Sequence, residues 1–282
     1  MLWGALWENV HIAHSAPRGY LELALKALPS ETDESLARIL GARIETVLHA
    51  YLSDQARRAV VPQVEAVVAD RMLHAPTLGL RIVNFRTFTG IAETPAALAQ
   101  IKNLLNGRLE VPGLTLKPLD RWNLIGHLIV MSDPEATALY AAEQARDRSG
   151  EGQKYAYAVM AGTPTPEIKA RYFLDYQNLK TVQEDWITQS LRPFNSWNQS
   201  ALTARYGTLA LNELPAIKQH RKIFFLGAWL GAFVAGQTTT DAQSAVETWL
   251  AQAQIDHDLR LKVLEAADAL NRTVMIRQRY PD

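Results

Sequence analysis

The stretch Ser30 to Tyr51, SETDESLARILGARIETVLHAY, carries the pattern that decides the fold. Its apolar side chains recur at intervals of three, four and seven residues, at Leu36, Ile39, Leu40, Val47, Leu48 and Tyr51. Those intervals place them on one face of an α-helix. The polar residues from Ser30 to Asp33 favour a helix start, because their side chains can accept hydrogen bonds from the first free backbone N–H groups. The stretch therefore predicts a helix with one buried face.

The same signals recur along the chain. In TPAALAQIKNLLNG, Thr94 is the predicted cap, Pro95 the first helical residue and Gly107 the terminator. Further helices are predicted to begin near Asp120, Asp133, Thr165 and Asp241, and the last to run from about Asp258 to Arg279. Helical periodicity is thus present almost throughout the sequence.

Evidence for strands is thin. Arg108 to Leu116 alternates briefly, but Pro112-Gly113 is a turn signal, so a loop between helices is predicted there. Roughly fourteen short helices follow from the caps and periodicity, too many for one simple bundle. We therefore predict an all-α fold, a degenerate α-solenoid of stacked antiparallel helix pairs resembling HEAT or armadillo arrays, without a strict period. No segment is long enough to be a linker, so residues 1–282 are predicted to form a single helical domain.

Composition excludes several classes of protein. Hydrophobic residues make up 48% and charged residues 21%, which is typical of a globular chain. Lys and Arg together equal Asp and Glu at 29 each, so no overall basic field favours nucleic acid. The chain has no cysteine, which excludes disulfides and thiolate metal sites and suits a cytoplasmic location.

The apolar stretches of the sequence predict neither a membrane span nor an export signal. The longest apolar run, Ile223 to Gly236, is too short to span a bilayer and predicts a buried core helix. The start, MLWGALWENV, lacks a basic region and a cleavage site, so it is no signal peptide. Helical periodicity begins at residue 2, which leads us to expect a chain cut from something longer.

Residues that could carry chemistry are few. His11 and His14 lie three apart, whereas the zincin pattern needs histidines four apart with Glu after the first, and the dipeptide His-Glu is absent. We therefore predict an ordinary helix end there and no metal ligands. His127 lies among apolar residues and is predicted to be a hydrogen-bonded core residue. The basic stretch KQHRK, Lys218 to Lys222, favours a solvated helix start, although it could hold a carboxylate or phosphate.

Several segments together resemble a known family. They are LWGALWENV (2–10), GYLELALKALPSETDE (19–34), FRTFTGIAETPAALAQIKNLLNGRLEVPGLTLKPLDRW (85–122), ALYAAEQARDRSGEGQKYAYAVMAGTPTPEIKARYF (138–173) and LTARYGTLALNELPAIKQHRK (202–222). Their order and spacing resemble the C-terminal helical domain of aminopeptidase N-type zinc aminopeptidases, the gluzincin family that includes the endoplasmic-reticulum aminopeptidases. Ser149 replaces the family's usual Thr, and VHIAHS (10–15) and PFNSWNQSAL (193–202) depart from its pattern.

The resemblance implies a chamber-forming domain that closes over a zinc-bearing catalytic domain of the same chain and admits peptides. That catalytic domain would hold zinc through His-Glu-x-x-His, which this chain lacks, and would remove N-terminal residues with a Glu as general base. The chain alone is expected to be inactive and to hold no metal. Its expected partners are the catalytic domain and peptide substrates, with no nucleic acid and no membrane. Arg221 and Lys222 are the candidates for contact with a peptide's C-terminal carboxylate. The alternative is a stand-alone α-solenoid that binds a protein partner.

Overall fold

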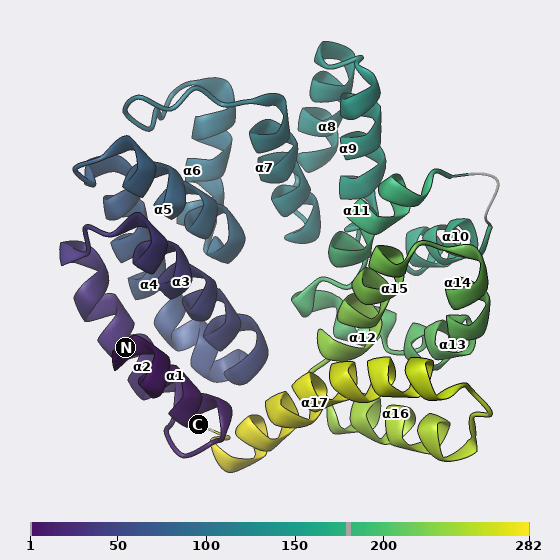
Figure 1. Ribbon diagram of the computed structural model, residues 1–282. Helices are drawn as coiled ribbons and strands as arrows, with labels where there is room; N and C mark the ends of the chain where they lie inside the picture. Colours follow the sequence, from purple (N-terminus) through teal and green to yellow (C-terminus); the bar gives the residue numbers. More distant parts are fainter. Residues whose placement is uncertain (1, 179–181, 282) are drawn as a thin grey trace. The chain divides into compact units, whose positions relative to one another are not determined.

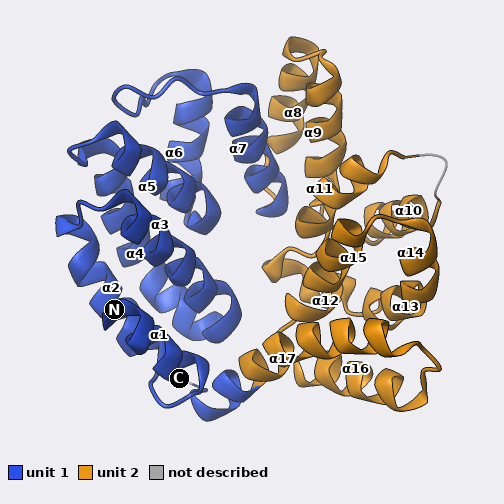
Figure 2. Cartoon of the chain, viewed as in Figure 1, with its two compact units in different colours: residues 1–131, 275–282 blue, residues 132–274 orange. Residues whose placement is uncertain are grey.

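The structure is a computed structural model that describes residues 2–178 and 182–281. Within those ranges every regular element is a helix and no strand occurs, which confirms the all-α prediction (Figure 1). The chain groups into two compact units, residues 1–131 with 275–282 and residues 132–274, coloured blue and orange in Figure 2. Two predictions stay predictions: that the helices form a solenoid, and that residues 1–282 form a single domain.

Unit 1 is built mainly from the first half of the chain. Its helices are α1 (Leu2–His11), α2 (Pro17–Ala27), α3 (Glu34–Thr46), α4 (Asp54–His74), α5 (Leu78–Ile91), α6 (Pro95–Asn106) and α7 (Pro118–Val130), with a 3-10 turn at Leu28–Ser30 and a π-helix, η2, at Val47–Tyr51. Helix α5 packs against both α3 and α4. Leu40 of α3, Val68 of α4 and Phe88 of α5 are fully buried.

The last residues of the chain also belong to unit 1. Helix α17 (His257–Arg279) begins in unit 2 and ends in unit 1. The Arg277 guanidinium donates to the carbonyls of Ala50 (3.0 Å) and Leu52 (3.2 Å) at the end of the π-helix. The Tyr280 hydroxyl donates to the carbonyl of Ala13 at 3.0 Å. Unit 1 is therefore assembled from two stretches far apart in the sequence.

Unit 2 has its own helices and core. It contains α8 (Ala136–Arg146), α9 (Gly150–Met160), α10 (Pro166–Gln177), α11 (Glu184–Phe194), α12 (Ser200–Thr203), α13 (Tyr206–Asn212), α14 (Leu214–His220), α15 (Ile223–Leu230), α16 (Thr240–Gln252) and most of α17, with a 3-10 turn at Trp197–Gln199 and a π-helix at Gly231–Ala235. Aromatic rings fill the centre. Trp229 lies 4.5 Å from Phe233 and 6.1 Å from Tyr176 between ring centroids, and its indole N–H donates to the carbonyl of Ala210.

Predicted helix starts agree with the structure at several positions. Asp33, Thr94 and Thr165 are N-caps whose side chains accept from backbone N–H groups three residues on. Gly107 ends α6 in the left-handed conformation. The loop predicted over Arg108–Leu116 is confirmed. Asp120 was predicted as a cap, but it is the third residue of α7, where its carboxylate accepts from the N–H of Lys117 at 2.9 Å.

The apolar run Ile223 to Gly236 forms α15 and the following π-helix. Its side chains from Phe225 to Val234 are largely buried in the core of unit 2, as predicted, but Ile223 and Phe224 are exposed. Across the described residues, no helix combines the length and apolar character needed to cross a bilayer.

Candidate functional site

Arg221 joins α14 to α15 and contacts a helix end. Its guanidinium donates to the carbonyl of Tyr176 at 3.1 Å, close to the last residue of α10, and lies 4.8 Å from the ring centre of Phe225. Its Nε is buried without a hydrogen-bond partner, and burial lowers the pKa of the guanidinium. It borders a small cavity of about 40 Å³ together with Trp229. Through these contacts the Arg221 side chain links the end of α10 to the start of α15.

Lys222 faces different surroundings. It is the N-cap residue of α15, its side chain is exposed, and its backbone N–H donates to the Glu184 carboxylate at 3.4 Å. Lys222 borders an open groove of about 700 Å³ that Arg221 does not line. The two predicted candidates are therefore neighbours in sequence that line different spaces.

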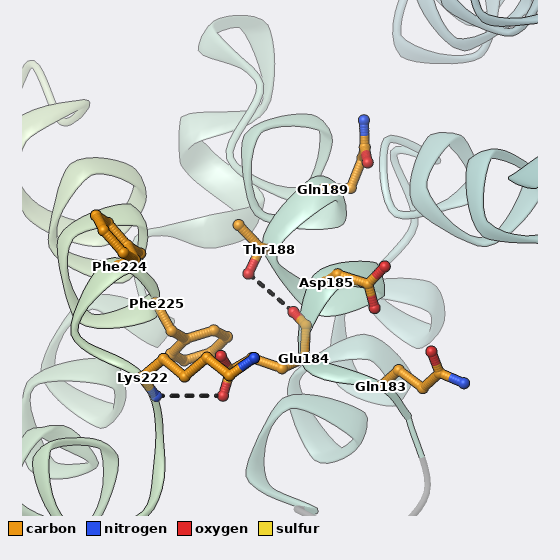
Figure 3. A pocket seen from close by; sticks show the side chains of 8 residues that line it. All are labelled: Gln183, Glu184, Asp185, Thr188, Gln189, Lys222, Phe224 and Phe225. Atoms are coloured by element: carbon orange, nitrogen blue, oxygen red, sulfur yellow. Dashed lines mark hydrogen bonds between the residues drawn. The ribbon is translucent and has the colours of Figure 1, made fainter.

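We call this open space the α11–α15 groove. It lies between the N-terminal turns of two helices, and its lining side chains are Gln183, Glu184, Asp185, Thr188, Gln189, Lys222, Phe224 and Phe225 (Figure 3). The two helices pack against each other. The Thr188 hydroxyl is occupied within its own helix, where it donates to the carbonyl of Glu184 at 2.8 Å. The groove thus has one wall of polar side chains and one of aromatic rings.

Among the described residues, the contacts that Glu184 and Asp185 make through their carboxylates are long. Asp185 lies 3.6 Å from the ammonium of Lys154, which is closer to Glu151, at 2.7 Å. The hydrogen bond that Lys154 donates to the Glu151 carboxylate raises the pKa of Lys154 and keeps it charged. Glu184 accepts from the N–H of Lys222 at 3.4 Å. Neither carboxylate nor Phe224 was predicted as a site residue, because nothing in the sequence shows that residues 184–188 and 222–225 come together.

Histidines do not assemble a metal site in the part of the chain that the structure describes. No group of three or more His, Asp or Glu side chains there could hold a metal ion, so these residues do not fit a zinc site. His11 is the last residue of α1 and its ring packs 4.7 Å from that of Trp7, as a helix-end residue. His127 is half-buried and bonds to the carbonyl of Ala92, and desolvation lowers its pKa, so the predicted hydrogen bond is confirmed.

Comparison with known proteins places the chain in a family. A model of the ERAP1-like C-terminal domain matches residues 1–272. The chain belongs to the ERAP1-like C-terminal domain family. Aminopeptidase N of Streptomyces lividans is 25% identical over 279 residues, which cover 97% of this chain and 32% of that protein. The chain thus spans about a third of the length of the curated relative that it matches. The described part of this ERAP1-like domain has the α11–α15 groove but no group of residues that could hold a metal ion.

Proposed function

We propose that this chain is the chamber-forming C-terminal domain of a zinc metallo-aminopeptidase that removes N-terminal residues from peptides. The observation that carries the proposal is the family match over residues 1–272, together with similarity to an aminopeptidase N along nearly the whole chain. Zinc would belong to a separate catalytic domain, since the described residues of this chain offer no ligand group. Its partners would be that domain and peptides, in the cytoplasm.

The role of this domain would be to enclose and orient the substrate. A wall that closes over a catalytic site excludes bulk water and limits access to chains that can thread inside. Within this role we assign Lys222 to an ionic contact with the C-terminal carboxylate of a bound peptide, because its side chain is exposed at the mouth of a groove. Arg221 is the weaker candidate for that contact, since its guanidinium is engaged by the carbonyl of Tyr176.

The first test is activity of the chain by itself. With added Zn²⁺, it is expected to hydrolyse leucine p-nitroanilide no faster than the same protein after heat denaturation. Mixed with a separately expressed zinc-binding catalytic domain, it should shift that domain's preference from small anilides towards longer peptides. Turnover by the chain alone that disappears in His11→Ala or His14→Ala would contradict the proposal.

The second test concerns Lys222. In the assembled enzyme, Lys222→Ala should raise KM for a peptide with a free C-terminus about threefold, in line with the modest strength of exposed ion pairs, and leave KM for the amidated peptide unchanged. Arg221→Lys serves as the neighbouring comparison. Equal effects on free and amidated peptides would remove Lys222 from this role without affecting the domain assignment.

A further inference from the structure

Asn106 is the one asparagine of the sequence that is followed by a glycine. It is the last residue of α6, and both Asn106 and Gly107 are exposed. Gly107 has φ 74°, and a Cβ added there would meet no atom within 4 Å. The peptide bond between the two residues is therefore open to solvent, and no side chain at position 107 hinders an approach to its nitrogen.

The carboxamide of Asn106 is turned back onto the backbone that follows it. Its Oδ1 accepts a hydrogen bond from the backbone N–H of Arg108 at 3.1 Å. This donor polarises the side-chain carbonyl, and it is already bonded to the oxygen on which negative charge would develop if a nucleophile attacked Cγ. The carboxamide is therefore an activated electrophile.

The backbone nitrogen of Gly107 is the nucleophile within reach, because it is covalently bonded to the backbone carbonyl of Asn106. Its N–H is shared between the carbonyls of Asn103 and Leu104, and the bond to Leu104 is long, at 3.4 Å. The last turn of a helix frays at little cost in free energy. Fraying of α6 frees this nitrogen and lets it turn towards Cγ.

We propose that Asn106 is a self-modification site, at which the chain converts its own carboxamide to a carboxylate. The Gly107 nitrogen gives its proton to a solvent base and bonds to Cγ of Asn106. The Cγ–Nδ2 bond breaks, Nδ2 takes up a proton and leaves as ammonia, and a cyclic imide remains. Water then adds to one of the two imide carbonyls and breaks the bond from that carbonyl to nitrogen. Attack at Cγ leaves aspartate, and attack at the backbone carbonyl leaves isoaspartate.

The two products act differently on the end of α6. Aspartate keeps the backbone as it is, and its carboxylate can still accept from the N–H of Arg108. Isoaspartate routes the chain through the side chain and so adds a methylene to the backbone. The carbonyl of Asn103 accepts from the N–H groups of Arg108 (2.9 Å) and Leu109 (3.1 Å), and the extra atom displaces both donors. Isoaspartate therefore removes the termination of α6. The proposal does not rest on the aminopeptidase role.

Asn195 provides a contrast within the same chain. It is also followed by a small residue, Ser196, but Asn195 is half-buried, and its Oδ1 is buried without a hydrogen-bond partner. Its amide donates to the carbonyl of Leu191 at 3.2 Å. This carboxamide has no activating donor on its oxygen, so Asn106 should react at least about tenfold faster than Asn195.

The experiment incubates the full, folded chain in mildly alkaline buffer and maps its peptides by mass spectrometry over time. The peptide that contains residue 106 should gain the mass difference between an amide and an acid. An isoaspartyl carboxyl methyltransferase with labelled S-adenosylmethionine should then label this peptide, because the enzyme methylates isoaspartate and not ordinary aspartate. We expect the reaction to be within about tenfold of its rate in a free peptide of residues 102–111, since fraying costs little. The rate should rise with pH, because the deprotonated nitrogen attacks.

Asn106→Gln is the matched control variant. It keeps a carboxamide at the end of α6 but would have to close a larger ring, so neither the mass gain at residue 106 nor its methyl label should appear. The proposal is overturned if residue 106 stays unmodified in the folded chain while the free peptide reacts, because the fold would then protect it. A reaction at Asn195 as fast as at Asn106, or a methyl label that persists in Asn106→Gln, would also overturn it. Should Asn106→Gln fail to fold, the peptide map of the wild type still decides, because it locates the modified residue.

Discussion

At Lys169, the fold buries an amine between the ends of two neighbouring helices. The side chain is 0% exposed and donates to the carbonyl of Ala161, after the end of α9, at 2.7 Å, and to that of Phe194, the last residue of α11, at 2.8 Å. Burial lowers the pKa of Lys169 from 10.5 to about 7. A neutral amine still has two N–H donors for these two carbonyls, so the contact survives deprotonation. Lys169 thus fastens α9, α10 and α11 together in either form.

The buried amine predicts a specific pH dependence of stability. Below about pH 7 both folded and unfolded states bind the proton, and the full penalty of burying the ammonium is present. Between that pH and about 10.5 the unfolded state binds more protons, so stability rises with pH. Relative to Lys169→Met, the wild type should gain about 2 kcal/mol of unfolding free energy between pH 7 and pH 9. Urea denaturation of both proteins at the two pH values measures this, and parallel pH profiles would contradict it.

Glu65 predicts a second effect at a single residue. It is buried in α4 and accepts from the backbone N–H groups of Glu93 (2.6 Å) and Thr94 (2.9 Å), at the start of α6. Glu65→Ala leaves both donors without their acceptor and should lower the unfolding free energy by about 3 kcal/mol, while Glu65→Gln keeps an oxygen and should lose about 1 kcal/mol. Urea denaturation checks both values, with exposed Glu22→Ala as the neutral control. Equal losses from Ala and Gln would exclude the acceptor role.

At the scale of a helix, two glycines predict changes of opposite sign. Gly107 follows α6 at φ 74°, a conformation that disfavours a side chain, whereas Gly227 lies inside α15, and a Cβ would meet no atom within 4 Å at either position. Gly107→Ala should destabilise by about 1 kcal/mol, and Gly227→Ala should stabilise by about 0.5–1 kcal/mol. Thermal melts of the two variants measure the difference. Two shifts of the same sign would mean that backbone conformation does not decide these positions.

Helix starts were predictable from sequence where a single side chain decides them. Asp33, Thr94 and Thr165 cap their helices through bonds that span only three residues. Asp120 was misplaced because Lys117-Pro118 starts α7 earlier, and a carboxylate at the third helical position resembles a cap in sequence.

The groove was not predictable from sequence, for two physical reasons. Its walls come from α11 and α15, and which helices pack together depends on tertiary contacts that no local pattern encodes. The run IFFLGAWLGAFVAG is apolar on every side, so its periodicity marks no solvent face and gives no sign that Phe224 is exposed. Lys222 was identified as a candidate because it is one of several clustered cations near a predicted helix start.

At the scale of the whole molecule, the end of the chain completes the first unit. Arg277→Ala removes the donor to the carbonyls of Ala50 and Leu52 and should lower stability by about 1–3 kcal/mol. Amide hydrogen exchange should rise first in peptides that cover residues 47–52 and 275–281. Arg279→Ala, at an exposed position of the same helix, is the control. Unchanged exchange in residues 47–52 would show that this contact does not secure the π-helix.

The split composition of unit 1 has a consequence for synthesis on the ribosome. Residues 132–274 form one uninterrupted stretch, so unit 2 holds all of its own core before the final residues are translated. Most of unit 1 precedes unit 2 along the chain, but unit 1 lacks the donors of Arg277 and Tyr280 until those two residues have been translated. Of the two units, the one that starts first along the chain is therefore completed last, and a chain truncated after residue 274 should still contain a protease-resistant unit 2.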